Sequence, residues 1–326
     1  SFCFHHRMTA PAAPRAVILQ IGPLMPALDA TLRDHHEVLP AQALNADAPL
    51  ANAADAARVT AVVTSAPVGV PAAWLPQLPA LKVVSSFGVG LDQLPLADCR
   101  ARGLPVGYTP DVLNDCVADL AMGLLIDGAR RIAAADRFVR RGDWLQGRFP
   151  LATKVSGKRL GIVGLGRIGQ AVARRAAGFD MDIAYTKRRP AEGVGWRHEP
   201  SLLALAQWAD FLVLTVAGGA DTRHLIDAEV LRALGPHGLL VNVARGSVVD
   251  QAALIACLHS GELGGAALDV FDDEPRVPQA LIDMEQVVLA PHMASGTLDT
   301  RQAMADLTLA NLRAGLAGEP LPSPAP

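Results

Sequence analysis

Short apolar runs alternate with amphipathic segments along the chain from residue 16 onward. The runs at 16–22, 59–66 and 81–88 are rich in Val and Ile, and the segment at 28–38 carries apolar residues at helical spacing. Pro and Gly punctuate the connections between them. Alternation of this kind is typical of an α/β fold with a parallel sheet. The pattern therefore predicts one α/β lobe that ends near residue 110.

A long helix and a second α/β lobe are predicted next. The stretch at 109–132 opens with Thr109-Pro110-Asp111, a helix-start signal, and continues with an apolar stripe. Six strand candidates follow, separated by helices or loops: 159–164, 181–186, 210–216, 239–244, 264–270 and 287–291. Such a series suits a doubly wound sheet. A final helix is expected over 297–318.

Composition and charge narrow the class of protein. A chain of 326 residues, 51% of them hydrophobic, can build one large or two medium domains with buried cores. Its net charge of -3 and its mixed charge pattern give no reason to expect a nucleic acid or a membrane surface as partner. No apolar stretch is long enough to span a bilayer. The start "SFCFHHRMTAPAAP" has no apolar signal core, and Met8 is a candidate first residue.

The four cysteines are scattered: Cys3, Cys99, Cys116 and Cys257. They form neither a Cys-x-x-Cys pair nor a Cys/His ligand pattern, which argues against a structural zinc or a disulfide scaffold. A cytoplasmic location is therefore predicted, and no motif calls for a metal.

A glycine-rich turn opens the second lobe. Gly164, Gly166 and Gly169 have the G-x-G-x-x-G spacing, directly after an apolar run and at the head of a helical run. The first permits a tight turn, the second admits a pyrophosphate and the third lets the helix pack on the strand. A glycine turn without a ligand is the weaker alternative, because strand and helix are both in place. The predicted dinucleotide contacts include the residues between the glycines: Leu165, Arg167 and Ile168.

Cations stand where a dinucleotide site usually has an acid. The next apolar run ends at Thr186, where an NAD site would place the carboxylate that holds the ribose, and Lys187, Arg188 and Arg189 follow. A carboxylate repels a 2′-phosphate, whereas a guanidinium grips it. A solvated basic loop is the alternative interpretation. We predict that NADP(H) is preferred and that NAD(H) is possible.

Three polar residues follow predicted strands in the last third of the chain: Arg245, Glu274 and His292. Strand carboxyl ends line the ligand crevice of an open α/β sheet, so these side chains could converge. Hydride reduction of a 2-oxo acid needs a cation for the carboxylate and carbonyl, which suits Arg245, and an acid for the developing alkoxide, which suits His292. Glu274 would stabilise the protonated imidazole. Each residue alone could be a surface ion pair, a turn residue or a loop histidine, so the prediction rests on the set.

Motifs over nearly the whole chain resemble the D-isomer-specific 2-hydroxyacid dehydrogenases, and specifically their NADPH-preferring glyoxylate/hydroxypyruvate reductase branch. They include "SSFGVGLDQL", "GKRLGIVGLGRIGQAVARR", "YTKRRP", "LVNVARGSVVD", "GAALDVFDDEP" and "LAPHMASGTLDTR". The resemblance implies reduction of small 2-oxo acids to D-2-hydroxy acids. Arg245 would bind the substrate, and Glu274 and His292 would form the acid/base pair.

The resemblance also implies further contacts and an architecture. The backbone of Val89 and Gly90 would hold the substrate carboxylate, and Asp269 would contact the nicotinamide carboxamide. A flavodoxin-like substrate domain would combine residues 1–109 with 297–326, and a Rossmann domain over 110–296 would be inserted between them. Family members commonly form homodimers, in which Trp144 would reach the active site of the partner subunit.

Two alternatives stay open at this point. One is an NAD-linked dehydrogenase of the same family with another substrate range. The other is a dinucleotide-sensing interaction protein, comparable to a corepressor branch that shares this fold and keeps the Arg/Glu/His set. Fold alone does not separate an enzyme from a sensor.

Overall fold

The computed structural model describes residues 15–326, in two compact units. One unit comprises the described chain up to Thr109 together with Met304–Pro326, and the other comprises Pro110–Ala303. Residues 1–14, which include Met8 and Cys3, lie outside the described residues. The assignment of the two units to substrate and cofactor stays a prediction.

The first unit is built on a five-stranded parallel sheet with the order β2-β1-β3-β4-β5. Its strands are β1 (Val17–Gln20), β2 (Glu37–Pro40), β3 (Ala61–Ser65), β4 (Val83–Phe87) and β5 (Val106–Gly107). Its connections contain α1 (Pro26–His35), α2 (Ala53–Arg58), the 3-10 helix η1 (Ala72–Gln77) and α3 (Leu96–Ala101). This strand order is the flavodoxin-like one.

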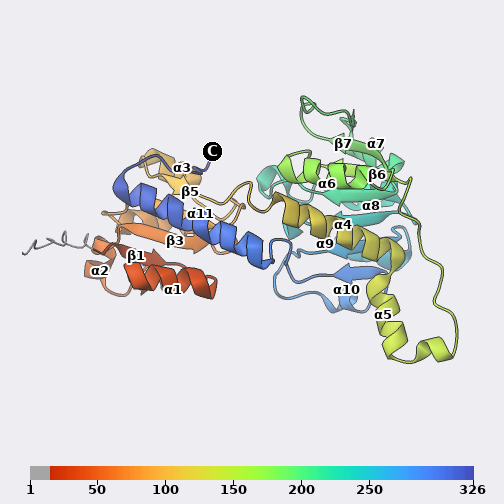
Figure 1. The fold of residues 1–326 in the computed structure, drawn as a ribbon, viewed down its shortest axis with the longest axis horizontal. Helices are drawn as coiled ribbons and strands as arrows, with labels where there is room; N and C mark the ends of the chain where they lie inside the picture. The colour runs from red at the N-terminus through yellow and green to blue at the C-terminus, as the bar shows by residue number, and fades with distance from the viewer. Residues whose placement is uncertain (1–14) are drawn as a thin grey trace, which may run out of the picture. The chain divides into compact units, whose positions relative to one another are not determined.

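The last helix of the chain packs on this sheet. Helix α11 (Leu298–Ala317) comes so close to β4 that a Cβ on Gly315 would lie 2.4 Å from the Cβ of Val83. The Ser85 hydroxyl donates to the Thr308 carbonyl at 2.8 Å, and the buried Asn311 amide donates to the Tyr108 carbonyl at 3.0 Å. The C-terminal part of α11 therefore completes the core of a unit whose other residues lie in the first third of the chain (Figure 1).

The second unit is built on a seven-stranded parallel sheet with the order β12-β11-β10-β9-β6-β7-β8. Its strands are β6 (Arg159–Val163), β7 (Asp182–Thr186), β8 (Arg197–His198), β9 (Phe211–Leu214), β10 (Leu239–Asn242), β11 (Gly265–Leu268) and β12 (Val287–Leu289). The order reverses between β6 and β9, which is the topological switch point of a doubly wound Rossmann sheet. The prediction of an α/β fold with a Rossmann sheet and a flavodoxin-like sheet is confirmed.

Helices cover the second sheet and extend beyond it (Figure 1). They are α4 (Asn114–Arg130), α5 (Ile132–Arg140), α6 (Arg167–Ala177), α7 (Leu202–Trp208), α8 (Ala228–Leu234), α9 (Gln251–Ser260) and α10 (Gln279–Ile282). Short 3-10 helices are η2 (Asp143–Leu145), η3 (Ala220–Thr222) and η4 (Gly246–Val248). Within residues 15–326, no helix combines the length and the apolar character that a bilayer crossing requires.

The predicted helix start at Thr109 is wrong. The Thr109 hydroxyl accepts a hydrogen bond from the Gly88 N–H at 3.0 Å, so it caps no helix. Asp111 has φ +69, outside the helical region, and α4 begins only at Asn114. The same helix was predicted to continue to residue 132, but it is interrupted at Arg131. The φ of +56 at this residue separates α4 from α5.

Three short strands escaped the hydrophobic pattern. The predicted helical segment at 28–38 runs into β2, and β5 and β8 have only two residues each. β2 and β8 are not buried apolar runs, because they lie at sheet edges with their residues at least partly exposed, whereas β5 is buried but only two residues long. Edge strands are defined by backbone pairing with a neighbour, which periodicity alone does not reveal.

Candidate active site

The predicted functional residues of the second unit gather at one edge of its sheet. All strands are parallel, so their carboxyl ends meet there. Gly164 follows β6, Thr186 ends β7, Asp269 follows β11 and His292 follows β12. Arg245 stands just after β10, in the turn that leads into η4. Sequence positions more than 100 residues apart thus lie at one edge of the sheet.

Glu274 and His292 form a direct pair. The Nδ1 of His292 lies 2.6 Å from Oε2 of Glu274, and Oε1 of Glu274 accepts the Phe271 N–H at 3.0 Å. The two side chains are 38% and 31% exposed, so the pair is reachable from solvent without being fully hydrated. An ionised carboxylate only accepts hydrogen bonds, so Nδ1 carries the hydrogen. Nε2 is then the nitrogen that can give or take a transferred proton.

The environment keeps the Glu274 carboxylate ionised. Burial by itself would raise the pKa of Glu274, but the hydrogen bonds from His292 and the Phe271 N–H and the charges of His292 and Arg245 outweigh it. The net result is a pKa below the usual value. A carboxylate that stays charged at neutral pH stabilises an adjacent imidazolium.

Asp269 holds the loop that carries His292. This fully buried side chain accepts the N–H groups of Met293 and Ala294 at 2.8 and 3.0 Å. Burial raises the pKa of Asp269, a shift that the two backbone hydrogen bonds oppose. His292 itself has φ +50, a strained conformation for a non-glycine residue, and such strain concentrates at functional sites. The predicted contact of Asp269 with the nicotinamide stays a prediction.

Arg245 lies in a turn organised by a residue that sequence reasoning missed. The buried Asn242 side chain accepts the Ala244 N–H at 2.9 Å and donates to the Arg245 carbonyl at 3.0 Å. Gly218 leaves room for the arginine stem, since a Cβ there would lie 2.8 Å from Arg245 Cγ. The signal in the sequence was an amide at the end of an apolar strand, a position where a buried polar group must serve the backbone.

The glycine turn has the shape of a dinucleotide cradle. Gly164 has φ +93, and a Cβ on it would lie 2.6 Å from Val216 Cγ1. A Cβ on Gly169 would lie 2.3 Å from the Gly164 carbonyl oxygen. By contrast, a Cβ on Gly166 would meet nothing within 4 Å, and no side chain caps the start of α6. Open space at the uncapped amino end of a helix is what a pyrophosphate needs.

This difference predicts distinct effects of two alanine substitutions. Gly169→Ala is expected to destabilise the fold by about 1 to 3 kcal/mol, because the new methyl group collides with backbone. Gly166→Ala should leave the free energy of unfolding nearly unchanged, since Gly166 has φ -84 and free surroundings, and should weaken dinucleotide binding instead. Urea unfolding and dinucleotide titration of both variants separate the two effects. Equal unfolding midpoints for the two would contradict the geometry.

The basic loop after β7 is anchored at both ends. The buried Tyr185 hydroxyl accepts the Ala191 N–H at 2.8 Å, and the His198 ring on β8 hydrogen bonds the Lys187 carbonyl at 2.9 Å. Lys187, Arg188 and Arg189 are exposed between these anchors. The loop is therefore fixed at both ends, and it exposes three cationic side chains. Tyr185 and His198 were not foreseen as loop supports.

One of these cations already has an acidic neighbour. Arg188 pairs with Asp221 of η3 at 2.6 Å, with side chains 82% and 76% exposed. An ion pair this exposed to water contributes little, so a phosphate could displace the carboxylate. Arg167 at the start of α6 pairs with Asp111 at 2.9 Å.

The remaining predicted contacts lie elsewhere. Val89 and Gly90 follow β4 in the first unit and are partly exposed. Trp144 lies in η2 and is 68% exposed. Cys99, Cys116 and Cys257 are free thiols, and within residues 15–326 no cluster of three or more His, Cys, Asp or Glu side chains is arranged to hold a metal ion. The roles of Val89, Gly90 and Trp144 stay predictions.

The sequence of residues 122–294, which carries the glycine turn and the Glu274–His292 pair, matches the D-isomer specific 2-hydroxyacid dehydrogenase family, NAD binding domain. The chain belongs to this family. As a D-2-hydroxyacid dehydrogenase it is a dinucleotide-dependent oxidoreductase, so the predicted class of enzyme is confirmed.

Relatives of this dehydrogenase cover most of its length. It is 48% identical to glyoxylate/hydroxypyruvate reductase A of Arabidopsis thaliana over 82% of this chain and 85% of that protein. It is also 48% identical to hydroxyphenylpyruvate reductase of Plectranthus scutellarioides, over 83% and 87%. A crystal structure of an NADPH-dependent glyoxylate/hydroxypyruvate reductase from Sinorhizobium meliloti, in complex with NADP and malonate, superposes with a TM-score of 0.88 at 40% identity, over 95% and 97% of the two chains.

Proposed function

We propose that this dehydrogenase reduces small 2-oxo acids, with glyoxylate and hydroxypyruvate as the principal class, to D-2-hydroxy acids at the expense of NADPH. The observation that carries the proposal is the 2.6 Å His292–Glu274 pair at the carboxyl edge of a Rossmann sheet. The NADPH preference draws support from the anchored loop with Lys187, Arg188 and Arg189 and from the NADP-bound relative.

The residues divide the chemistry between them. NADPH, when bound, supplies the hydride. Arg245 binds the substrate carboxylate and polarises the carbonyl, and the backbone of Val89 and Gly90 holds the same carboxylate. His292 donates its Nε2 proton to the oxygen as negative charge develops there. Glu274 keeps the imidazole oriented and stabilises its protonated form.

The cofactor would lie across the glycine turn. Its pyrophosphate fits the open space over Gly166 at the uncapped start of α6. The ribose 2′-phosphate is assigned to Arg188 and its neighbours, in exchange for the Asp221 carboxylate.

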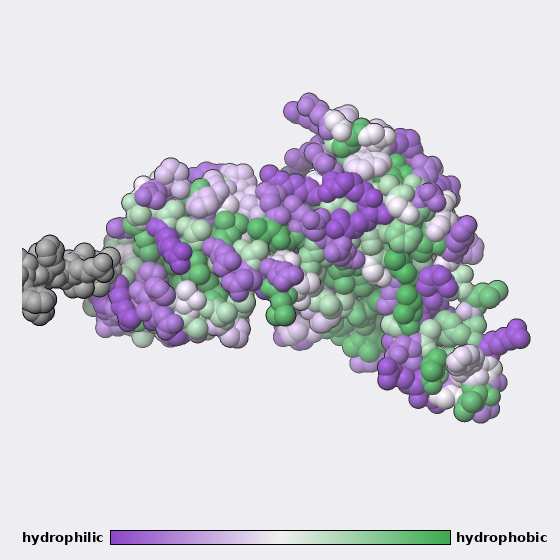
Figure 2. All heavy atoms as spheres, in the orientation of Figure 1, coloured by the Kyte–Doolittle hydropathy of each residue, from purple (hydrophilic) through white to green (hydrophobic). Residues whose placement is uncertain are grey.

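We further infer a homodimer in the cytoplasm. Helix α5 has no buried residue, and the segment that follows it exposes Trp144, Leu145 and Leu151. Figure 2 shows apolar surface on this projecting segment, which a second copy of the chain would cover. Trp144 would then serve the partner subunit's active site. The free cysteines favour a reducing compartment.

The test is the initial rate of NADPH or NADH oxidation with glyoxylate, hydroxypyruvate, pyruvate and 4-hydroxyphenylpyruvate. Preference for NADPH with the small acids is expected. Preference for the aromatic acid would assign the pocket to the other substrate class seen among the relatives, and dinucleotide binding without turnover on any acid would favour a sensor.

A further inference from the structure

A cavity lies in the first unit, at the amino ends of its strands. It has a volume of about 590 Å³ and is lined by the residues that lead into β1, β3 and β4, by the end of α1 and by α11. Lys82 precedes β4, whereas the predicted substrate contact Val89 follows it. The five-residue strand between them spans about 16 Å at the usual rise of a parallel strand. The cavity is therefore separate from the substrate contacts that this unit supplies.

The ionisable side chains that line this cavity can carry only positive charge. Its ionisable residues are all basic: Arg15, His35, His36, Lys82 and Arg313. No aspartate or glutamate lines it. A concave surface with cations only concentrates anions, because the low-dielectric walls focus the field.

Two of these basic residues, Lys82 and Arg313, are not neutralised by a neighbouring side chain that the structure describes. Among residues 15–326, neither the Lys82 ammonium nor the Arg313 guanidinium has an ion pair or a side-chain hydrogen bond. Other arginines of the same unit are paired, as Arg33 is with Asp29 and Arg58 with Glu37. The cavity thus holds charge that the protein does not neutralise internally.

The environment of His36 reflects its burial and the basic residues around the cavity. Its Nδ1 is buried and has no hydrogen-bond partner among the described residues. Burial, followed by the charges of His35, Arg313 and Arg15, lowers the pKa of His36. Buried polar atoms in proteins nearly always have a partner, so this unsatisfied nitrogen is an exception in the wall of the cavity.

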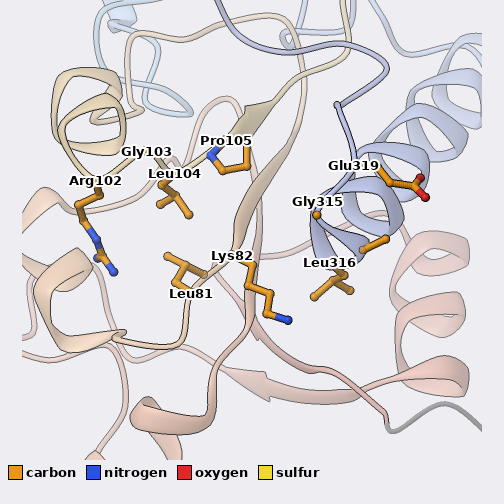
Figure 3. Close-up of a pocket in the computed structure, with 11 residues that line it drawn as sticks. Leu81, Lys82, Arg102, Gly103, Leu104, Pro105, Gly315, Leu316 and Glu319 are labelled. Atoms are coloured by element: carbon orange, nitrogen blue, oxygen red, sulfur yellow. The ribbon is translucent and has the colours of Figure 1, made fainter.

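The rest of the wall is apolar. Val17 and Leu312 are buried beside the cavity, and Leu309 and Leu316 line it from α11. A neighbouring hollow of about 500 Å³ shares Lys82 and Leu316. Figure 3 shows Lys82 in that hollow extending toward the end of α11 near Leu316. Arg102 in the same hollow is committed to the carbonyls of Leu75 and Leu78, so Lys82 is its available cation.

We propose that the cavity between α1, α11 and the amino ends of β1, β3 and β4 binds a small organic anion, with a carboxylate or phosphate head between Lys82 and Arg313 and an apolar body against Leu309, Leu312 and Leu316. Charge-assisted hydrogen bonds from two cations hold the head. The apolar wall distinguishes this ligand from a free inorganic ion, in the manner of other small-molecule pockets of this size.

Isothermal titration of the full chain tests the site with four probes. Phenyl phosphate and 4-phenylbutyrate combine both features with different heads, inorganic phosphate has only the charge, and benzyl alcohol has only the ring. Titrations are made with NADPH at saturation, so that the dinucleotide site is filled, and without any added carboxylate that would compete for the cavity. We expect at least one of the first two probes to bind, and inorganic phosphate and benzyl alcohol to bind much more weakly.

Variants locate the binding. Lys82→Gln with Arg313→Gln is expected to weaken the affinity by about tenfold or more, while Arg174→Gln, an exposed cation of α6, should leave it unchanged. Turnover of 2-oxo acids should be the same in all three proteins, and thermal unfolding checks that they fold; the single substitutions replace the double one if it does not. Absence of binding by both organic anions, or equal binding by the double variant, would overturn the proposal. The readout is independent of turnover, so failure of the proposed reductase activity would leave it standing.

Discussion

Replacing His292 by alanine is expected to lower kcat by about two to four orders of magnitude, which is the range for loss of a general acid. Nε2 of His292 is the nitrogen left available by the Nδ1 contact with Glu274. Without the imidazole, the developing alkoxide would have to take its proton from water. The glycine turn lies on other strands and its geometry does not depend on this ring, so the affinity for NADPH should be nearly unchanged.

The measurement is single-turnover reduction of glyoxylate together with a fluorescence titration of NADPH. Glu274→Gln is the matched control, because it keeps the shape of the partner and removes its charge. It should lower kcat less than the alanine variant does, because the imidazole stays in place and loses only its charged partner. Loss of turnover together with loss of NADPH binding and a lower Tm would assign His292 a role in folding.

Arg188→Asp is expected to lower kcat/KM with NADPH by about a hundredfold while leaving kcat/KM with NADH nearly as it was. A hydrogen bond to a charged group contributes about 1.5 to 3 kcal/mol, and the substituted carboxylate adds repulsion toward a 2′-phosphate. NADH carries a hydroxyl at that position and does not lose such a contact. The ratio of the two values, measured from initial rates at saturating substrate, is the quantity that decides.

Asp221→Asn provides the complementary variant. It releases Arg188 from its 2.6 Å ion pair and removes an exposed negative charge beside the loop, so it should raise kcat/KM with NADPH modestly and affect NADH less. If Arg188→Asp lowered kcat/KM equally with NADPH and with NADH, the loop would have a role in folding or in binding the adenine. If it changed neither, the three cations would face solvent.

Much of the fold and of the candidate site could be predicted from the sequence. Buried parallel strands are nearly continuous apolar runs, so β1, β3, β4 and most of the second sheet stood out in the pattern. The glycine turn was readable because its spacing follows from local backbone requirements, as the φ of +93 at Gly164 shows. Arg245, Glu274 and His292 could be proposed because residues after parallel strands share one edge whatever their separation in sequence.

Only the tertiary structure decided how these parts are held. Three examples are contacts between separate segments of the chain. The Thr109 hydroxyl accepts from the Gly88 N–H, Asp269 holds the loop that carries His292, and α11 packs on β4 through Gly315. Hydrophobic periodicity records which face of each element is buried, whereas hydrogen-bond partners and close packing depend on which elements meet. The sequence by itself therefore determined the elements and the chemical groups, and three-dimensional contact determined their partners, the support of the basic loop and the cationic cavity between α1 and α11.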